Sequence, residues 1–111
     1  MSSKVLVRDS NSLEIKSILI KDGGLTVGRN PESDIVLGEM KVSRHHATFE
    51  YRKRFGIGIL TVRDCGSMHG TFVNGCRVRS KVLFEGDIVR IGKYELYVAS
   101  GSSKPLELRP R

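Results

Sequence analysis

The sequence predicts an all-β fold, a sandwich or a barrel, on three observations. Apolar and polar residues alternate with the two-residue period of half-buried strands. Clusters of glycine, asparagine and aspartate separate these short segments at regular intervals, as turns do. No segment keeps the period of a long helix, and the chain has no internal repeat. Many short strands with such punctuation are typical of sandwiches and barrels.

Two segments show the alternation most clearly. Residues 47–51 read Ala-Thr-Phe-Glu-Tyr and residues 94–98 read Tyr-Glu-Leu-Tyr-Val, so every second side chain faces a core. Leu13 to Ile20 is also expected to be a strand, with a bulge at Ser17 where the alternation slips by one residue. Further strands rich in branched residues are expected at Val5–Val7, Leu25–Val27, Ile35–Leu37, Ile57–Val62 and Ile88–Val89.

The length of 111 residues and the mass of 12.4 kDa predict one domain with a single core. Residues 1–99 are expected to form this domain. Residues 100–111, which include Pro105 and Pro110, are expected to be a loosely ordered basic tail or linker. Asn74-Gly75 is a strong signal for a tight hairpin, because both residues tolerate a positive φ.

The sequence also predicts an intracellular monomer. No apolar run approaches the roughly 20 residues that cross a bilayer, so no membrane partner is expected. The N-terminus lacks the apolar stretch of a secretory signal. Cys65 and Cys76 are too few for a disulfide framework. A nuclear or cytoplasmic location follows, and the residues do not distinguish the two.

The formal net charge of +7 and the pI near 9.8 favour acidic partners: phosphopeptides, acidic proteins or nucleic acid. The excess charge is equally compatible with a role in solubility alone. Two basic runs, Arg52–Arg54 and Arg77–Lys81, are candidates for nucleic-acid binding. Few aromatic residues accompany them, so base stacking has weak support, and nucleic acid stays an alternative partner.

Three polar clusters stand at breaks between the apolar segments. Gly28-Arg29 ends one strand, a cluster from Ser43 to His46 precedes the strand at Ala47, and the third runs from Gly66 to Gly75. A guanidinium group offers a rigid fork of donors that matches phosphate oxygens. We expect the hydroxyl and the N–H of Ser43 to donate to an oxyanion. The clusters therefore indicate a protein that binds a phosphorylated partner.

These residues also have other interpretations. Arg29 taken alone favours a surface ion pair with Glu32 or Asp34, and only the combination of clusters favours a phosphate site. The candidate zinc ligands are His45, His46, His69, Cys65 and Cys76. The tight spacings of zinc motifs are absent among them. Asp64, Ser67 and His69 are of the residue types that form a hydrolytic triad. Residues so close together on one turn rarely reach triad geometry. We therefore expect no catalytic residue, no metal and no enzyme activity.

The order and spacing of the clusters resemble the forkhead-associated domain family from about Leu25 to Val98. The matching elements are Gly28-Arg29, Ser43-Arg44-x-His46-Ala47, Asp64-x-Gly66-Ser67-x-His69-Gly70-Thr71-Phe72-Val73-Asn74-Gly75, and Gly86-Asp87 to Ile91-Gly92. The resemblance implies a β-sandwich of two twisted, mainly antiparallel sheets with ligand-binding loops at one end. It also implies binding of phosphothreonine-containing peptides of partner proteins, with no catalysis and no cofactor.

Carried over position by position, the resemblance assigns a role to each site residue. The phosphopeptide-binding residues are Arg29, Ser43, Arg44, Met68 and His69. The loop-supporting residues are Gly28, His46, Gly70 and Asn74, with His46 as the buried histidine of the family. The resemblance slightly favours a nuclear location. A phosphate-independent scaffold or dimerisation domain remains the alternative function.

His69 departs from the family pattern, in which asparagine is common at this position. The asparagine amide grips the ligand backbone with one donor and one acceptor. An imidazole ring also donates and accepts, but in different directions. The phosphate pocket is therefore expected to be intact, while His69 is expected to weaken or retune the grip on the peptide main chain.

Overall fold

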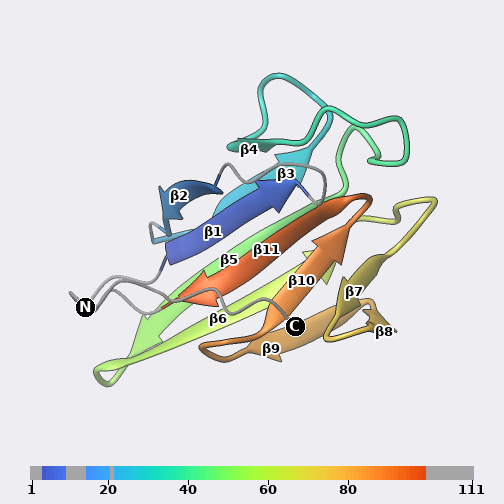
Figure 1. Ribbon diagram of the computed structural model, residues 1–111. Helices are drawn as coiled ribbons and strands as arrows, with labels where there is room; N and C mark the ends of the chain where they lie inside the picture. The colour runs from blue at the N-terminus through green and yellow to red at the C-terminus, as the bar shows by residue number, and fades with distance from the viewer. Residues whose placement is uncertain (1–3, 10–14, 21, 100–111) are drawn as a thin grey trace.

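The protein is a sandwich of two β-sheets, as the computed structural model describes it over residues 4–9, 15–20 and 22–99 (Figure 1). The described residues contain no helix. All strand pairs are antiparallel except β3 with β4. The predicted all-β sandwich is thus confirmed.

One sheet has six strands in the order β2-β1-β11-β10-β7-β8. Its strands are β1 Lys4–Asp9, β2 Ile15–Leu19, β7 Thr71–Val73, β8 Cys76–Val78, β10 Ile88–Ile91 and β11 Tyr94–Ala99. The other sheet has five strands in the order β4-β3-β5-β6-β9. Its strands are β3 Leu25–Gly28, β4 Ile35–Val36, β5 Ala47–Arg54, β6 Ile57–Asp64 and β9 Ser80–Leu83.

The core lies between the two sheets and follows from the predicted alternation. Phe49 and Val62 of the five-stranded sheet are fully buried, as are Val5 and Leu96 of the six-stranded sheet. Burying a side chain of this size stabilises the fold by about 1.5–3 kcal/mol. The core therefore packs the two sheets face to face, and this packing sets where the loops at their ends lie.

The expected bulge at Ser17 is wrong for the described residues. β2 pairs with β1 in one unbroken register, from Lys4 opposite Leu19 to Arg8 opposite Ile15. The alternation slips because Ile15 and Leu19 are exposed apolar residues on an edge strand. Leu13, where the predicted strand begins, lies outside the described residues.

The short strands β7, β8 and β9 were not predicted individually, because three or four residues leave too little alternation to recognise. The turn at Asn74-Gly75 closes the β7–β8 hairpin as predicted: φ is +49° at Asn74 and +88° at Gly75. The predicted tail, residues 100–111, lies outside the described part of the chain, as do residues 1–3.

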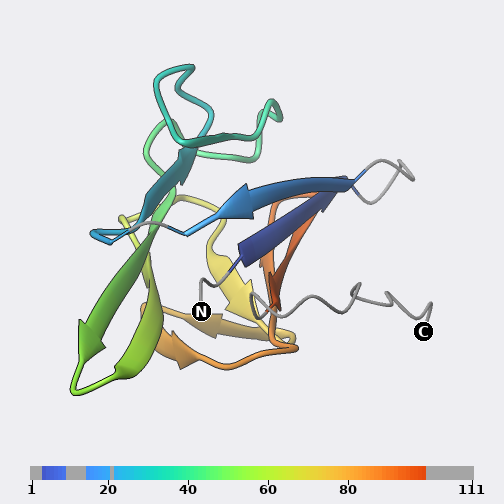
Figure 2. The ribbon, with the colours of Figure 1, turned by 90° about the vertical axis from the view of Figure 1, so that its left-hand side faces the viewer.

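The two ends of the sandwich differ. Loops after β3, before β5 and between β6 and β7 gather at one end, and the long β5–β6 hairpin projects at the other (Figures 1 and 2). Within the described residues no helix is long and apolar enough to cross a membrane.

Candidate functional site

Hydrogen bonds join the loops at one end of the sandwich. The Arg29 N–H donates to the Ser43 carbonyl at 3.0 Å, and the Asn30 N–H donates to the Arg44 carbonyl at 3.2 Å. The Met68 N–H donates to Ser43 Oγ at 3.3 Å, which brings in the β6–β7 loop. We call these loops the loop cluster: residues 28–34, 37–46 and 64–71.

Gly28 makes this close approach possible. A Cβ atom at Gly28 would lie 2.0 Å from the backbone oxygen of Arg44, far inside van der Waals contact. Backbone atoms cannot move aside as the end of a long side chain can. The absence of a side chain at Gly28 therefore lets the end of β3 lie against residues 43 and 44, which supports the predicted role of this glycine in the loops.

The backbones of Arg29 and Ser43 are neighbours, and each side chain keeps hydrogen-bond donors that no other described residue uses. Arg29 is exposed, and its Nε donates to the Val42 carbonyl at 3.2 Å, which fixes the start of the guanidinium group. Its terminal nitrogens have no hydrogen-bond partner among the described residues. Ser43 Oγ accepts from Met68, so its own hydroxyl proton remains available to a ligand. Arg44 is exposed beside them.

The Ser43 N–H does not point to a ligand, contrary to the prediction. It donates to Nδ1 of His46 at 3.0 Å. His46 is fully buried, and its Nε2 lies 2.9 Å from the Gly70 carbonyl, to which it donates. The imidazole ring thus joins two loops that are 24 residues apart in the sequence. His45, its neighbour, is exposed.

The Asp64 carboxylate organises the β6–β7 loop, and its central role was missed from the sequence. Oδ2 accepts from the N–H groups of Gly66 and Ser67 at 3.0 and 2.9 Å. Oδ1 accepts from the hydroxyls of Ser67 and Thr71 at 2.5 and 2.8 Å. The signal in the sequence is an aspartate followed by glycine and serine two and three residues later, which is typical of a turn closed by a side chain.

Burial and hydrogen bonding act in opposite directions on the pKa of Asp64. Desolvation raises it, whereas the hydroxyls of Ser67 and Thr71 and the N–H groups of Ser67 and Gly66 lower it. The combined hydrogen bonds outweigh desolvation, so the pKa of Asp64 lies below its ordinary value of 3.8. Asp64 is therefore ionised at neutral pH and holds the loop as an acceptor.

Met68 and His69 lie at the apex of this loop. Met68 is 80% exposed, and His69 is exposed as well. The His69 side chain has no hydrogen-bond partner within the described part of the chain. Gly70 follows with φ +92° and donates its N–H to Ser67 Oγ at 3.0 Å. The loop thus presents residues 68 and 69 to solvent on a fixed backbone.

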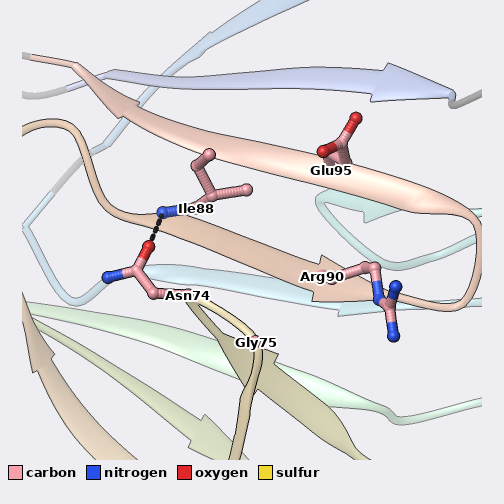
Figure 3. Close-up of a pocket in the computed structure, with 5 residues that line it drawn as sticks. All are labelled: Asn74, Gly75, Ile88, Arg90 and Glu95. Atoms are coloured by element: carbon pink, nitrogen blue, oxygen red, sulfur yellow. Dashed lines mark hydrogen bonds between the residues drawn. The ribbon is translucent and has the colours of Figure 1, made fainter. Parts of the chain in front are cut away.

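Asn74 lies apart from the loop cluster, at the far end of β7 from Thr71. Its Oδ1 accepts from the Ile88 N–H at 3.0 Å (Figure 3). Its Nδ2 donates to Asp87 at 3.0 Å. It lines a surface cavity of about 520 Å³ together with Arg90 and other residues. Asn74 therefore fastens the β7–β8 turn to β10, and its predicted support of the binding loops is not direct.

The geometry argues against the catalytic alternative. The Ser67 hydroxyl donates to Asp64 and accepts from Gly70, so it is committed to the loop. His69 makes no hydrogen bond to Ser67 in the structure. Desolvation and the charge of Asp64 raise the pKa of the Cys65 thiol above its ordinary 9.0, which lowers its reactivity. Among the described residues no group of three or more His, Cys, Asp or Glu could hold a metal.

A model of the FHA domain, the forkhead-associated domain, matches residues 25–92, which include the whole loop cluster. The chain belongs to the FHA domain family. Two curated relatives are 46% identical to this FHA domain over 76 residues, or 68% of the chain. They are an oxoglutarate dehydrogenase inhibitor of Corynebacterium efficiens and the glycogen accumulation regulator GarA of Mycolicibacterium smegmatis. The matches cover 51% and 46% of their lengths, so the chain spans about half of each.

Solved structures of other proteins share the fold. The FhaA FHA domain, complexed with the intracellular domain of Rv3910, is 25% identical with a TM-score of 0.75, over 87% of this chain and 99% of that one. Mycobacterium tuberculosis EmbR, in complex with a low affinity phosphopeptide, is 27% identical with a TM-score of 0.74, over 92% and 26%. The curated relatives named above are bacterial, so the slight preference for a nuclear location has no support.

Proposed function

We propose that this FHA domain binds phosphothreonine-containing segments of partner proteins and acts inside the cell by binding alone, without catalysis. The observation that carries the proposal is the backbone contact between Arg29 and Ser43, both of which keep side-chain donors that no described residue uses. The relatives named as a regulator and an inhibitor support a role in controlling other proteins through contact.

In this proposal Arg29 and the Ser43 hydroxyl bind the phosphate, and Arg44 adds charge. A charge-assisted hydrogen bond contributes about 1.5–3 kcal/mol. Two or three such bonds with modest peptide contacts reach micromolar affinity, which corresponds to about −8 kcal/mol. Because phosphorylation supplies up to two negative charges, the unmodified peptide loses most of this energy. Met68 and His69 contact the peptide beside the phosphothreonine.

A degenerate peptide library tests the proposal. We expect the full chain to select phosphothreonine peptides, and to bind the same sequences about 100-fold more weakly after phosphatase treatment. Fluorescence anisotropy on selected sequences measures both affinities. Equal binding before and after phosphatase treatment would overturn the proposal and support the phosphate-independent scaffold.

His69→Asn is expected to tighten phosphopeptide binding by about tenfold, since one good hydrogen bond is worth about 1–1.5 kcal/mol. The amide supplies one donor and one acceptor to the peptide main chain at the apex of the loop, where His69 is exposed. Isothermal titration with one selected phosphopeptide measures the change. His45→Asn makes the same exchange at another exposed histidine and should leave the affinity within about twofold. Unchanged or weaker binding by His69→Asn would show that position 69 does not grip the peptide.

A further inference from the structure

A second surface lies on the β5–β6 hairpin, which projects at the end of the sandwich opposite the loop cluster (Figures 1 and 2), and on the neighbouring strand β9. Phe55 is 100% exposed, Ile57 65% and Phe84 70%, and Ile59 and Val82 are exposed too. Soluble proteins rarely gather so many large apolar side chains on one surface without a partner. We call this set the hairpin surface: Arg52 to Ile59, Val82 and Phe84.

The tip of the β5–β6 hairpin carries an unusual residue for its backbone. Phe55 has φ +51° and Gly56 has φ +76°, both in the left-handed region. The β7–β8 hairpin of the same chain has nearly the same geometry but uses Asn74-Gly75. Asparagine tolerates this conformation, whereas a bulky aromatic residue is strained in it. Neither turn geometry nor core packing accounts for Phe55, which points to a contact with another molecule.

Basic and apolar side chains share one face of this hairpin. Arg52 lies opposite Ile59 and Arg54 opposite Ile57, so all four project from the outer face of the five-stranded sheet. Arg52, Arg54 and Ile59 line a cavity of about 280 Å³ together with Glu50 and Thr61.

The charge of this face is positive in spite of Glu50. The Glu50 carboxylate is paired with Arg63 at 3.5 Å. Arg52, Lys53 and Arg54 form no ion pair among the described residues. The hairpin surface thus combines unpaired cations with a cavity that Ile59 lines as its one apolar residue.

We propose that the hairpin surface binds an acidic protein segment that carries a large apolar side chain. The apolar side chain enters the cavity beside Ile59, and the flanking carboxylates pair with Arg52 and Arg54, whose forked donors match carboxylate geometry. Phe55 covers the segment at the tip. This contact is separate from the loop cluster, so one partner occupies each end of the domain or one long partner spans both.

The arrangement favours a protein over the other anionic partners. A bilayer would contact the projecting tip, but the two arginines and two isoleucines lie on the flat side of the sheet. Nucleic acid would use the cations but would leave Ile57 and Ile59 without apolar cover. An acidic segment with an apolar side chain would pair with the arginines and would also cover the exposed isoleucines.

Nuclear magnetic resonance titration of the full chain tests the inference. The probe is a pool of synthetic peptides in which leucine or phenylalanine is flanked by glutamates, and the control pool has lysines instead. We expect the glutamate pool to shift the backbone amides of residues 52–59 and 82–84 and to leave those of Ser43, Met68 and His69 in place. The lysine pool should shift neither set.

Phe55→Asn separates binding from folding. Because asparagine suits the turn, this variant should unfold at a higher denaturant concentration than the parent. Yet it should bind the glutamate pool about tenfold more weakly, because it lacks the aromatic contact. Arg52→Ser combined with Arg54→Ser should cost about tenfold or more. Lys16→Ser combined with Arg90→Ser removes the same charge from the other sheet and should have little effect.

Three outcomes would overturn the inference. The first is the absence of amide shifts with the glutamate pool. The second is undiminished binding by Phe55→Asn or by the double arginine variant. The third is that phosphatidylserine vesicles or a DNA duplex shift residues 52–59 while the peptides do not, which would assign the surface to lipid or to nucleic acid.

Discussion

Arg29→Ala should abolish measurable phosphopeptide binding. The guanidinium group is anchored by its Nε to the Val42 carbonyl, and its terminal nitrogens remain for a ligand. Two charge-assisted hydrogen bonds to phosphate contribute about 3–6 kcal/mol, so their loss weakens binding by roughly 100-fold or more. Fluorescence anisotropy with a selected phosphothreonine peptide measures the loss. The fold should persist, because the Arg29 side chain is exposed and makes no ion pair among the described residues.

Lys16→Ala is the control for this experiment. It removes one positive charge from an exposed lysine of edge strand β2 in the other sheet, so phosphopeptide affinity should stay within about twofold if the effect of Arg29→Ala is local. Comparable losses from both variants would indicate that net charge, and not the loop cluster, attracts the peptide. Parental affinity in Arg29→Ala would show that the assigned pocket is wrong.

Asp64→Asn should lower the free energy of unfolding by about 3 kcal/mol, because hydrogen bonds to a charged group contribute about 1.5–3 kcal/mol each. The amide keeps one acceptor oxygen but turns an NH₂ group toward the donors of the Gly66–Thr71 loop. Urea denaturation at neutral pH measures the change. Asp22→Asn alters an exposed carboxylate outside this network and should have little effect.

The same carboxylate predicts the direction of a pH dependence. The folded state lowers the pKa of Asp64, so its stabilisation is complete above the ordinary pKa of 3.8 and is lost as the pH falls through the lower folded value. The stability difference between the parent and Asp64→Asn should therefore shrink in acid below that range. A difference that stays constant down to the acid unfolding of both proteins would refute the ionised role of Asp64.

Much of the fold could be predicted because the relevant signals are local. The burial of alternate residues in Ala47–Tyr51 and Tyr94–Val98 follows from the two-residue period of a strand. Asn74-Gly75 specifies its hairpin through the φ angles that these two residues tolerate. Edge strand β2 misled the prediction, because exposed Ile15 and Leu19 mimic buried positions.

The candidate phosphate site could also be predicted, because the chemistry of a side chain depends only on its residue type. Gly28-Arg29 and Ser43-Arg44 identified a candidate phosphate site because guanidinium and hydroxyl groups bind phosphate wherever the chain places them. The hydrogen-bond partners of the surrounding groups could not be predicted, because these partners lie far away in the sequence. Nothing in the sequence alone shows that the Ser43 N–H is taken by His46, or that Asn74 faces Ile88 and not the loops.

By itself, then, the sequence determined the strands, the turns and the side chains available to a ligand, because backbone conformation and burial period depend on neighbours in the chain. The tertiary structure decided which loops meet and which donors remain free. His46 reaches Gly70, Met68 reaches Ser43, and the backbone of Arg44 fills the space that Gly28 leaves open. These contacts join residues far apart in the sequence, so they exist only once the two sheets have packed and brought the strand ends together.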